Sequence, residues 1–368
     1  MDKTNESKET TKQRFSLPFH VIKRINIPVW KKILIYAVAI ITGLLLSSLI
    51  CAGFAGKSPV DFFVYLFKGA FGSSRRIWVL LLDMALLLGT SIALIPAFKM
   101  KFWNLGGNGQ ILVGCLSAVA CMNFLGGKVS NGLLIFIMFL ASVAAGIIWA
   151  LIPALFKAFF NTNETLFTLM MNYIAIGLVR FCIASWVKSG SGVLTPIGYG
   201  NLPKLYNDQL LTILVFVILT LFMFVYLKYS KHGYEISVVG ESVNTAKYVG
   251  INVSKVIIRT MILSGAIAGL VGFFIAGAVD HTVSDAAANN MGFTAIMTSW
   301  LAAFNPLVMM LTCFFISFIS KGMLQVRTDF GLSSDSIANI VVGLVYFCVI
   351  ACAFFVNYKI VFRKKEDK

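Results

Sequence analysis

Few residues in this 368-residue sequence could carry out chemistry by themselves. The triplet Gly56-Lys57-Ser58 could end a phosphate-binding loop, but Cys51 stands where that loop needs its first glycine, and an apolar run precedes it instead of a strand. The three histidines, His20, His232 and His281, lie far apart in the sequence and are not accompanied by clustered carboxylates. The sequence therefore predicts no nucleotide-hydrolysing site, no catalytic residue and no metal site.

Asp83 is the carboxylate that lies deep within an apolar run. Because burying a carboxylate in hydrocarbon costs a few kcal/mol, Asp83 is a candidate functional residue; the alternative is that it pairs with a neighbouring helix or stays protonated. Arg180 lies towards the outer end of its run, where its side chain is expected to reach the interface. The seven cysteines fall mostly within apolar runs without metal-ligand spacing, which predicts neither zinc binding nor disulfides.

Most of the chain is too apolar to be solvated by water. Hydrophobic residues make up 58% of it and charged residues 12%, with a mean hydropathy of +0.86, whereas soluble domains are about one quarter charged. Long apolar runs occupy residues 33–54, 77–98, 133–156, 166–187, 210–227, 256–279 and 337–356, and shorter ones occupy 110–125, 292–304 and 307–320. Since about 20 apolar residues in a helix cross a bilayer, the sequence predicts an all-α bundle of about ten membrane-spanning segments.

The net charge of +16 is carried mainly between the apolar runs. Lysine and arginine collect on the cytoplasmic side of membrane proteins. This rule predicts a basic cytoplasmic segment over residues 1–32, a transmembrane domain over 33–358 and a basic cytoplasmic tail over 359–368. A membrane location also accounts for the basic charge without a nucleic-acid partner.

The same charge rule assigns the loops to the two faces of the membrane. It puts the loops at 99–109, 157–164 and 228–255 inside, and those at 188–209 and 280–290 outside. One loop does not fit, because the predicted first outside loop carries four cations, Lys57, Lys68, Arg75 and Arg76.

The loop over residues 228–255 is longer than a simple connection requires. Ser242 or Asn244 can cap a short helix that continues through Tyr248, and Gly250 can end that helix in a left-handed conformation. A motor subunit could contact such a helix on the cytoplasmic surface, so the loop is predicted to couple the chain to a separate ATP-hydrolysing partner. The alternative is a loop with a structural role only.

Four blocks of the sequence resemble the permeases of ABC importers for simple sugars and nucleosides, in the branch served by basic-membrane-protein-type lipoproteins. Residues 102–110, FWNLGGNGQ, resemble the family motif F-N-I-G-x-E-G-Q, and residues 163–174, NETLFTLMMNYI, resemble N-E-V-x-x-T-x-M-x-N-Y-I. The other two blocks are residues 233–253 and 264–272. The chain departs from the first motif at Trp103 and at Asn108, which stands in place of the usual acidic residue.

This resemblance implies a multi-pass permease in a bacterial cell membrane. Besides membrane lipid, its implied partners are a second homologous permease subunit, a cytoplasmic ATP-binding subunit and an extracellular substrate-binding lipoprotein. ATP and Mg²⁺ would bind the partner ATPase, and no cofactor is implied in this chain. The resemblance favours purine nucleosides as cargo and leaves simple sugars open. The residues that it implies at the ATPase interface are Gly240, Glu241, Asn244, Tyr248 and Gly250.

Two segments are candidates for the solute path. Residues 104–113 and 289–299 each open with Asn and Gly before a short apolar run, and the predicted topology makes them enter the membrane from opposite faces. Paired interrupted segments of this kind, related as in an inverted repeat, are typical of a translocation path, whereas glycines that only permit tight packing are the alternative. The residues assigned to the path are Asn104, Gly106, Gln110, Asn172 and Thr294, although Asn172 could equally join two helices.

Gly265, Gly269 and Gly272 lie on nearly one face of a predicted helix and are expected to let another helix approach closely. Two other functions stay open. A stand-alone secondary carrier or facilitator for a small polar solute is the main alternative, although a single buried acid gives little support for ion coupling. A membrane enzyme is a weaker alternative, because no cluster of catalytic side chains is visible.

Overall fold

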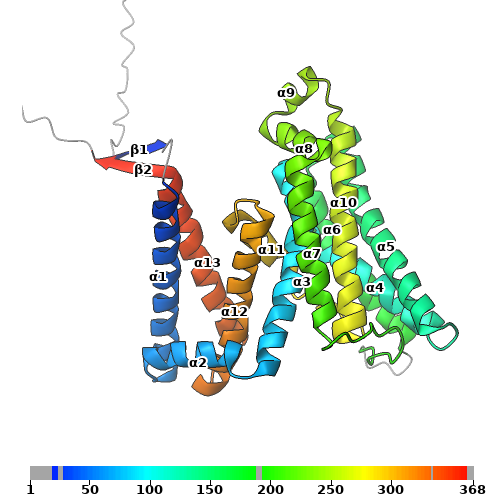
Figure 1. Cartoon of the computed structure of the whole chain (residues 1–368), viewed down its shortest axis with the longest axis horizontal. Coiled ribbons are helices and arrows are strands. Elements are labelled where there is room, and N and C mark those ends of the chain that lie inside the picture. Colours follow the sequence, from blue (N-terminus) through cyan, green and yellow to red (C-terminus); the bar gives the residue numbers. More distant parts are fainter. Residues whose placement is uncertain (1–18, 24–27, 188–192, 333–334, 363–368) are drawn as a thin grey trace, which may run out of the picture. The chain divides into compact units, whose positions relative to one another are not determined.

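The computed structural model describes residues 19–23, 28–187, 193–332 and 335–362, and most of them are helical (Figure 1). The chain divides into two compact units, one covering Cys51–Val342 and the other containing most of the first and last helices. The predicted all-α class is confirmed. Residues 1–18 and 363–368, which belong to the predicted basic terminal segments, lie outside the described residues.

The larger unit contains the helices between the first and the last. They are α2 (Pro59–Phe71), α3 (Ser74–Lys99), α4 (Gly107–Leu125), α5 (Asn131–Phe160), α6 (Glu164–Trp186), α7 (Leu210–Tyr229), α8 (Lys231–Glu241), α9 (Val243–Tyr248), α10 (Val253–Phe274) with its π-helical extension η1 (Ile275–Asp280), α11 (Met291–Leu301) and α12 (Pro306–Phe330).

The predicted number of spans agrees with the structure. Eight helices of the described chain are long and apolar enough to cross a membrane, and α11 and part of the last helix are shorter apolar helices. The predicted run at 110–125 belongs to α4, a helix long enough to cross the membrane. The run predicted to end at residue 320 continues as α12 to Phe330. That extension was missed because Lys321, Gln325, Arg327 and Asp329 interrupt the apolar pattern.

The smaller unit contains α1 (Val29–Ala55) up to residue 50 and α13 (Asp335–Asn357) from residue 343 onwards. The two helices approach closely where Gly43 faces the backbone of Val345, since a Cβ on this glycine would lie 3.1 Å from the Cα of Val345. Two strands, β1 (Phe19–Lys23) and β2 (Tyr358–Phe362), pair antiparallel and were not predicted. This pairing brings the two ends of the described chain together.

Contacts between loops within the larger unit support the predicted grouping of its loops. At the end occupied by α8 and α9, the Ser254 hydroxyl donates to the backbone oxygen of Ala158 at 3.1 Å. At the opposite end, called the far end below, the backbone N–H of Ile197 donates to the oxygen of His281 at 2.8 Å. The loops predicted to share a face therefore contact one another.

Helix α10 lies at the centre of the larger unit, between α4, α5 and α3 (Figure 1). Its glycines make the close approach possible, because a Cβ placed on Gly114 of α4 or on Gly146 of α5 would lie 2.8 Å from the Cα of Gly269. Gly265 and Gly272 face backbone atoms of α5 and α4 respectively. The packing role predicted for these glycines is confirmed.

The short helix α2 was not predicted from the sequence. It lies in the predicted first outside loop, whose four cations do not fit the charge rule. Ser58 caps it by accepting from the N–H of Val60 at 3.3 Å, and Pro59 occupies its first turn, where the missing N–H costs nothing. Its buried face packs on α12, where a Cβ on Gly69 would lie 2.9 Å from the Cα of Gly322. The predicted first outside loop therefore contains a helix of its own.

Candidate functional site

The first candidate site is the non-helical segment between α3 and α4. Lys101 takes a left-handed conformation with φ 59°, which turns the chain after α3 ends. The side-chain oxygen of Asn104 then accepts from the N–H of Gly106 at 3.0 Å, and its amide donates to the Ser264 hydroxyl of α10 at 3.3 Å. Gln110 and Asn104 also contact each other through their side-chain amides at 3.4 and 3.5 Å. Asn104 therefore fixes the start of α4 to the central helix.

Helix α6 holds this segment from the other side. Thr168 and Asn172 are four residues apart and so lie on one helical face. The Thr168 hydroxyl accepts from the N–H of Leu105 at 3.1 Å, and the Asn172 amide donates to the oxygen of Leu105 at 2.8 Å. The oxygen of Asn172 also accepts from the N–H of Gly109 at 2.8 Å. Two blocks far apart in the sequence thus form one hydrogen-bonded unit.

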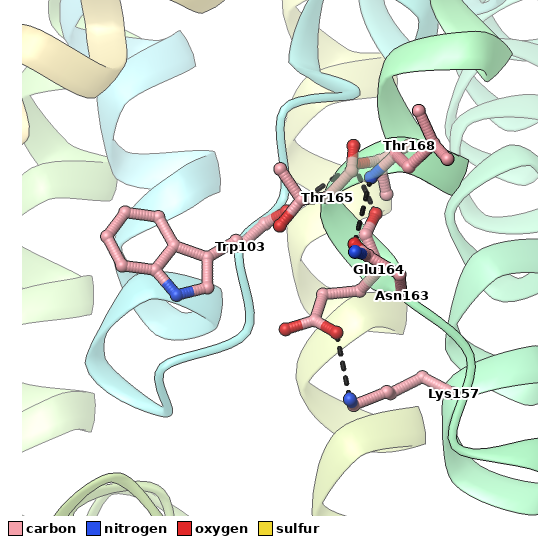
Figure 2. Close-up of polar contacts among 7 residues, drawn as sticks. Trp103, Lys157, Asn163, Glu164, Thr165 and Thr168 are labelled. Atoms are coloured by element: carbon pink, nitrogen blue, oxygen red, sulfur yellow. Dashed lines mark hydrogen bonds and ion pairs between the residues drawn. The ribbon is translucent and has the colours of Figure 1, made fainter.

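The start of α6 is fixed by two further contacts (Figure 2). Asn163 caps the helix by accepting from the N–H of Leu166 at 3.1 Å. Glu164 pairs with Lys157 at the end of α5, with 2.8 Å between the charged atoms, and Figure 2 shows Lys157 on the side of Glu164 away from Thr168. A carboxylate in the first turn also interacts favourably with the helix dipole. These contacts hold the α6 N-terminus against the end of α5.

A hollow of about 230 Å³ lies next to this ion pair and joins three of the sequence blocks. Phe102 comes from the first block, Glu164 from the second, and Gly240, Glu241 and Ser242 from the third. Gly240 is required there because any side chain would collide with the backbone oxygen of Lys99. Residues at the end of α8 are therefore in direct contact with the end of α3.

Two short helices, α8 and α9, project at this end of the larger unit (Figure 1). Ser242 caps α9 by accepting from the N–H of Thr245 at 3.2 Å, and Gly250 follows it with φ 82°, so both predicted features are confirmed. Asn244 lies inside α9 and is not its cap, and α8 itself was missed. Tyr248 is 92% exposed. The end of α9 is therefore free to contact another protein.

His232 anchors α8 to the two neighbouring long helices. Its Nδ1 lies 2.7 Å from the hydroxyl of Tyr226 on α7, and its Nε2 lies 3.4 Å from the hydroxyl of Thr260 on α10. Burial lowers the pKa of His232, because the charged imidazolium is poorly solvated there. A neutral imidazole, which can donate at one nitrogen and accept at the other, suits this position.

Helices α4 and α11 begin at the same place and run in opposite directions. The side-chain oxygen of Asn108 in the first turn of α4 accepts from the N–H of Gly292 in the first turn of α11 at 2.7 Å. From there α11 runs towards the α8 end, where Trp300 stacks on Trp103 with 5.7 Å between ring centres. The two interrupted segments that the sequence singled out thus meet at their N-terminal ends.

The residues assigned to the solute path are separated into two places by the structure. Asn104, Gln110 and Asn172 are 0%, 1% and 4% exposed, and they bond to other protein groups around the start of α4. Gly106 lies beside them, where a Cβ would be 3.1 Å from the side-chain oxygen of Asn104. Thr294 lies elsewhere, in the wall of a cavity. The structure therefore brings four of these residues together and leaves Thr294 apart.

That cavity, called the Asp83 cavity here, has a volume of about 350 Å³ and lies between α3, η1, α11 and α12. Its wall includes an ion pair, because the Nζ of Lys321 lies 2.5 Å from the Oδ2 of Asp83. The predicted alternative for Asp83, pairing with a neighbouring helix, is therefore confirmed. The other polar residues of the wall are Asp280, Ser284, Asn289, Thr294, Ser317 and Ser320.

Most residues of this wall were not predicted from the sequence. Lys321 was left outside the apolar run predicted at 307–320, although Ser317 and Ser320 lie four and one residues before it on the same helix. The spacing of Ser317 and Lys321 would have placed both on one face of a longer helix. Asp280 was also overlooked, because it ends an apolar run and was assigned to the outside loop.

Arg180 has a partner that the sequence did not indicate. Its guanidinium forms two hydrogen bonds, of 2.8 and 2.6 Å, with one carboxylate oxygen of Asp285 in the loop after η1. Both side chains remain substantially exposed. Reaching the membrane interface is therefore not the only role of the Arg180 side chain. It also joins α6 to the loop at 281–290.

Comparison with known proteins gives one family and several curated relatives. The model of the branched-chain amino acid transport system / permease component family matches residues 76–350. The nucleoside ABC transporter permease protein NupB of Lactococcus lactis is 25% identical over 87% of this chain and 91% of its own length. The guanosine permease NupP of Bacillus subtilis is 26% identical over 88% and 93%, and the glucose permease TsgB13 of Haloferax volcanii is 26% identical over 92% of each. No solved structure gives a significant match.

Proposed function

The chain belongs to the branched-chain amino acid transport system / permease component family and is a multi-pass permease subunit of an ABC importer, and on this premise we propose that it carries a neutral nucleoside or a related simple sugar. Membership of the family favours this importer over the stand-alone carrier. NupB and NupP are named for nucleosides and guanosine, and TsgB13 for glucose, so the relatives support both cargo classes.

The Asp83 cavity is the feature that carries the cargo proposal. Its volume of about 350 Å³ lies in the range of small-molecule sites. Its charged residues are two carboxylates and one lysine, surrounded by hydroxyl and amide groups. Such a wall accepts hydrogen bonds from sugar hydroxyls or base N–H groups, whereas two carboxylates repel an anionic solute. A neutral solute rich in hydrogen-bond donors therefore suits this cavity best.

For energy coupling, we propose that the α8–α9 end faces the cytoplasm and docks on an ATP-binding subunit that holds ATP and Mg²⁺. The exposed end of α9, with Asn244, Tyr248 and Gly250, would form the contact. Gly240 and Glu241 would transmit movements of the ATP-binding subunit to α3. The basic loops at this end support the orientation. A second permease subunit and an extracellular binding lipoprotein would complete the importer.

The segment around Asn104, Gly106, Gln110 and Asn172 has a different proposed part in transport. Its polar groups are already bonded within the protein, so it would move as one piece with the start of α4. Because the N-terminal ends of α4 and α11 meet at Asn108 and Gly292, a shift of this segment would reach the wall of the Asp83 cavity through Thr294 on α11.

Uptake that depends on ATP is the expected result for the whole importer. Cells with and without this chain would be supplied with labelled guanosine, and uptake would be measured with ATP depleted while the ion gradients are clamped. We expect the chain-dependent uptake to disappear when ATP is depleted. Uptake that persists under the clamped gradient would instead indicate a secondary carrier, and uptake of glucose but not guanosine would contradict the nucleoside proposal.

Substitution of Gly250 by valine is expected to reduce uptake several-fold without lowering the amount of protein in the membrane. A Cβ at Gly250 meets no atom within 4 Å, so the effect comes from the left-handed backbone, which costs a β-branched residue about 1–2 kcal/mol or more. The matched control is Gly250→Asn, because asparagine tolerates this conformation. Equal uptake by the valine and asparagine variants would argue against a coupling role for this turn.

A further inference from the structure

A second pocket, called the arginine pocket here, lies at the far end of the larger unit. It has a volume of about 420 Å³ and is formed by the end of α2, the start of α3 and the last turns of α12. Arg75 and Arg76 contribute to it from α3, and Lys321 contributes from α12. Its wall contains no carboxylate among the described residues. Three cations thus surround one hollow at the end of the unit where the charge rule predicts few.

The charges of this pocket are only partly neutralised by the groups around it. Lys321 is paired with Asp83, whereas no ion pair of Arg75 or Arg76 occurs within the described ranges. One guanidinium nitrogen of Arg76 donates to the backbone oxygen of Lys68 at 2.8 Å. Asp329, one residue after the wall residue Thr328, accepts from Gln325 at 2.5 Å and is not part of the wall. Two guanidinium groups therefore remain available to an anion.

The pocket also lies at the level expected for the membrane interface. Helix α2 has 13 residues, which is too short to cross a bilayer. Its outer face exposes apolar side chains, with Val60 at 68% and Val64 at 56%, as in a helix that lies in the interface. Trp78 at the start of α3 packs on Tyr206 with 6.5 Å between ring centres and 50° between the ring planes, and these residue types mark the interface in membrane proteins.

We propose that the arginine pocket binds the phosphodiester head group of an anionic phospholipid. Planar guanidinium groups bind phosphate oxygens through pairs of hydrogen bonds, and Ser73, whose hydroxyl oxygen accepts from the N–H of Arg76, adds one hydroxyl donor. Val79 and Leu324 supply apolar wall for the glycerol and the first acyl carbons. The wall offers no carboxylate to a choline or ethanolamine ammonium, which favours an anionic over a zwitterionic lipid. This proposal does not depend on the cargo.

The test compares lipid retention by the full chain and by Arg75→Ala/Arg76→Ala. Both would be placed in nanodiscs of mixed phosphatidylglycerol and phosphatidylcholine, extracted gently and examined by native mass spectrometry. We expect the wild type to retain phosphatidylglycerol and the double variant to retain roughly tenfold less, since each basic residue near a membrane surface contributes to the attraction of anionic lipid. The matched control, Lys128→Ala/Lys204→Ala, removes two exposed cations at the same end and should retain lipid normally.

Each other outcome decides against the proposal. Equal retention by the wild type and the arginine variant, or equal retention of both lipids, would overturn it. Displacement of the lipid by millimolar inorganic phosphate, with the same dependence on Arg75 and Arg76, would show that free phosphate is the ligand. If the alanine variant does not fold, Arg75→Lys/Arg76→Lys replaces it. Lysine keeps the charge but loses the paired hydrogen bonds, so unchanged retention by that variant would contradict binding through guanidinium groups.

Discussion

Substitution of Gly269 by leucine is expected to leave little folded protein in the membrane. This glycine lies where α10 crosses both α4 and α5, and a Cβ placed on it would collide with the backbone oxygen of Ser142 and lie 3.2 Å from the Cα of Val143. Overpacking costs about 1–3 kcal/mol where side chains can adjust. At Gly269 the obstructing atoms belong to the backbone, so the helices would have to separate.

The matched control for this prediction is Gly177→Leu. Gly177 also lies inside a membrane-spanning helix, but it is exposed and a Cβ there meets no atom within 4 Å. Membrane levels and thermal unfolding of the purified proteins would be compared. Wild-type levels and a wild-type Tm for Gly269→Leu would mean that α10 does not pack against α4 and α5 as closely as described.

Neutralising either member of the Asp83–Lys321 pair is expected to reduce uptake at least about tenfold. The two charged atoms lie 2.5 Å apart in the wall of the Asp83 cavity, and the side chains are only 38% and 24% exposed. Removing one partner leaves the other charge poorly solvated, and about 1.4 kcal/mol of lost interaction already corresponds to a tenfold change. Asp83→Asn and Lys321→Gln keep nearly the same size, so their effect reports the charge.

The exchanged variant, Asp83→Lys/Lys321→Asp, separates a structural pair from a solute contact. It is expected to restore the membrane level and the Tm, because the ion pair is kept. If it also restores uptake, the pair acts only by joining α3 to α12. If uptake stays low, the carboxylate is needed on α3, which would support its contact with the cargo. Full uptake by Asp83→Asn, with an unchanged KM, would contradict both roles.

The general fold could be predicted because hydrocarbon requires long apolar helices, and these appear directly in the sequence. The ends of helices were harder to predict where polar residues face the interior of the protein. Lys321 lies inside α12 but beyond the run predicted to end at residue 320, because its charge interrupts the apolar pattern and its partner Asp83 is distant in the sequence. Helix α2 was missed for a similar reason, since Lys57 and Lys68 mark its ends as polar while Phe62 and Leu66 face α12.

The candidate site was predictable in its local features. The Ser242 cap and the left-handed Gly250 follow from the properties of single residues, and both predictions hold. Which side chains share a cavity depends on how distant helices pack, and one sequence does not record this. Asn104 and Asn172 were grouped correctly with each other, whereas Thr294 belongs with residues such as Asp280 and Ser317, which gave no local signal.

The distance along the chain between Asp83 and Lys321 also has a consequence for biogenesis. A ribosome produces Lys321 roughly 240 residues after Asp83, which corresponds to about 12 to 48 s of synthesis. During this interval α3 has no Lys321 to pair with Asp83, and an aspartate at the centre of a membrane helix costs about 2.5–3.5 kcal/mol on insertion scales. Leu80, Leu82, Leu86, Leu87 and Leu88 surround Asp83 in the sequence and offset this cost. The leucines around Asp83 therefore serve the nascent chain at the translocon as well as the finished core.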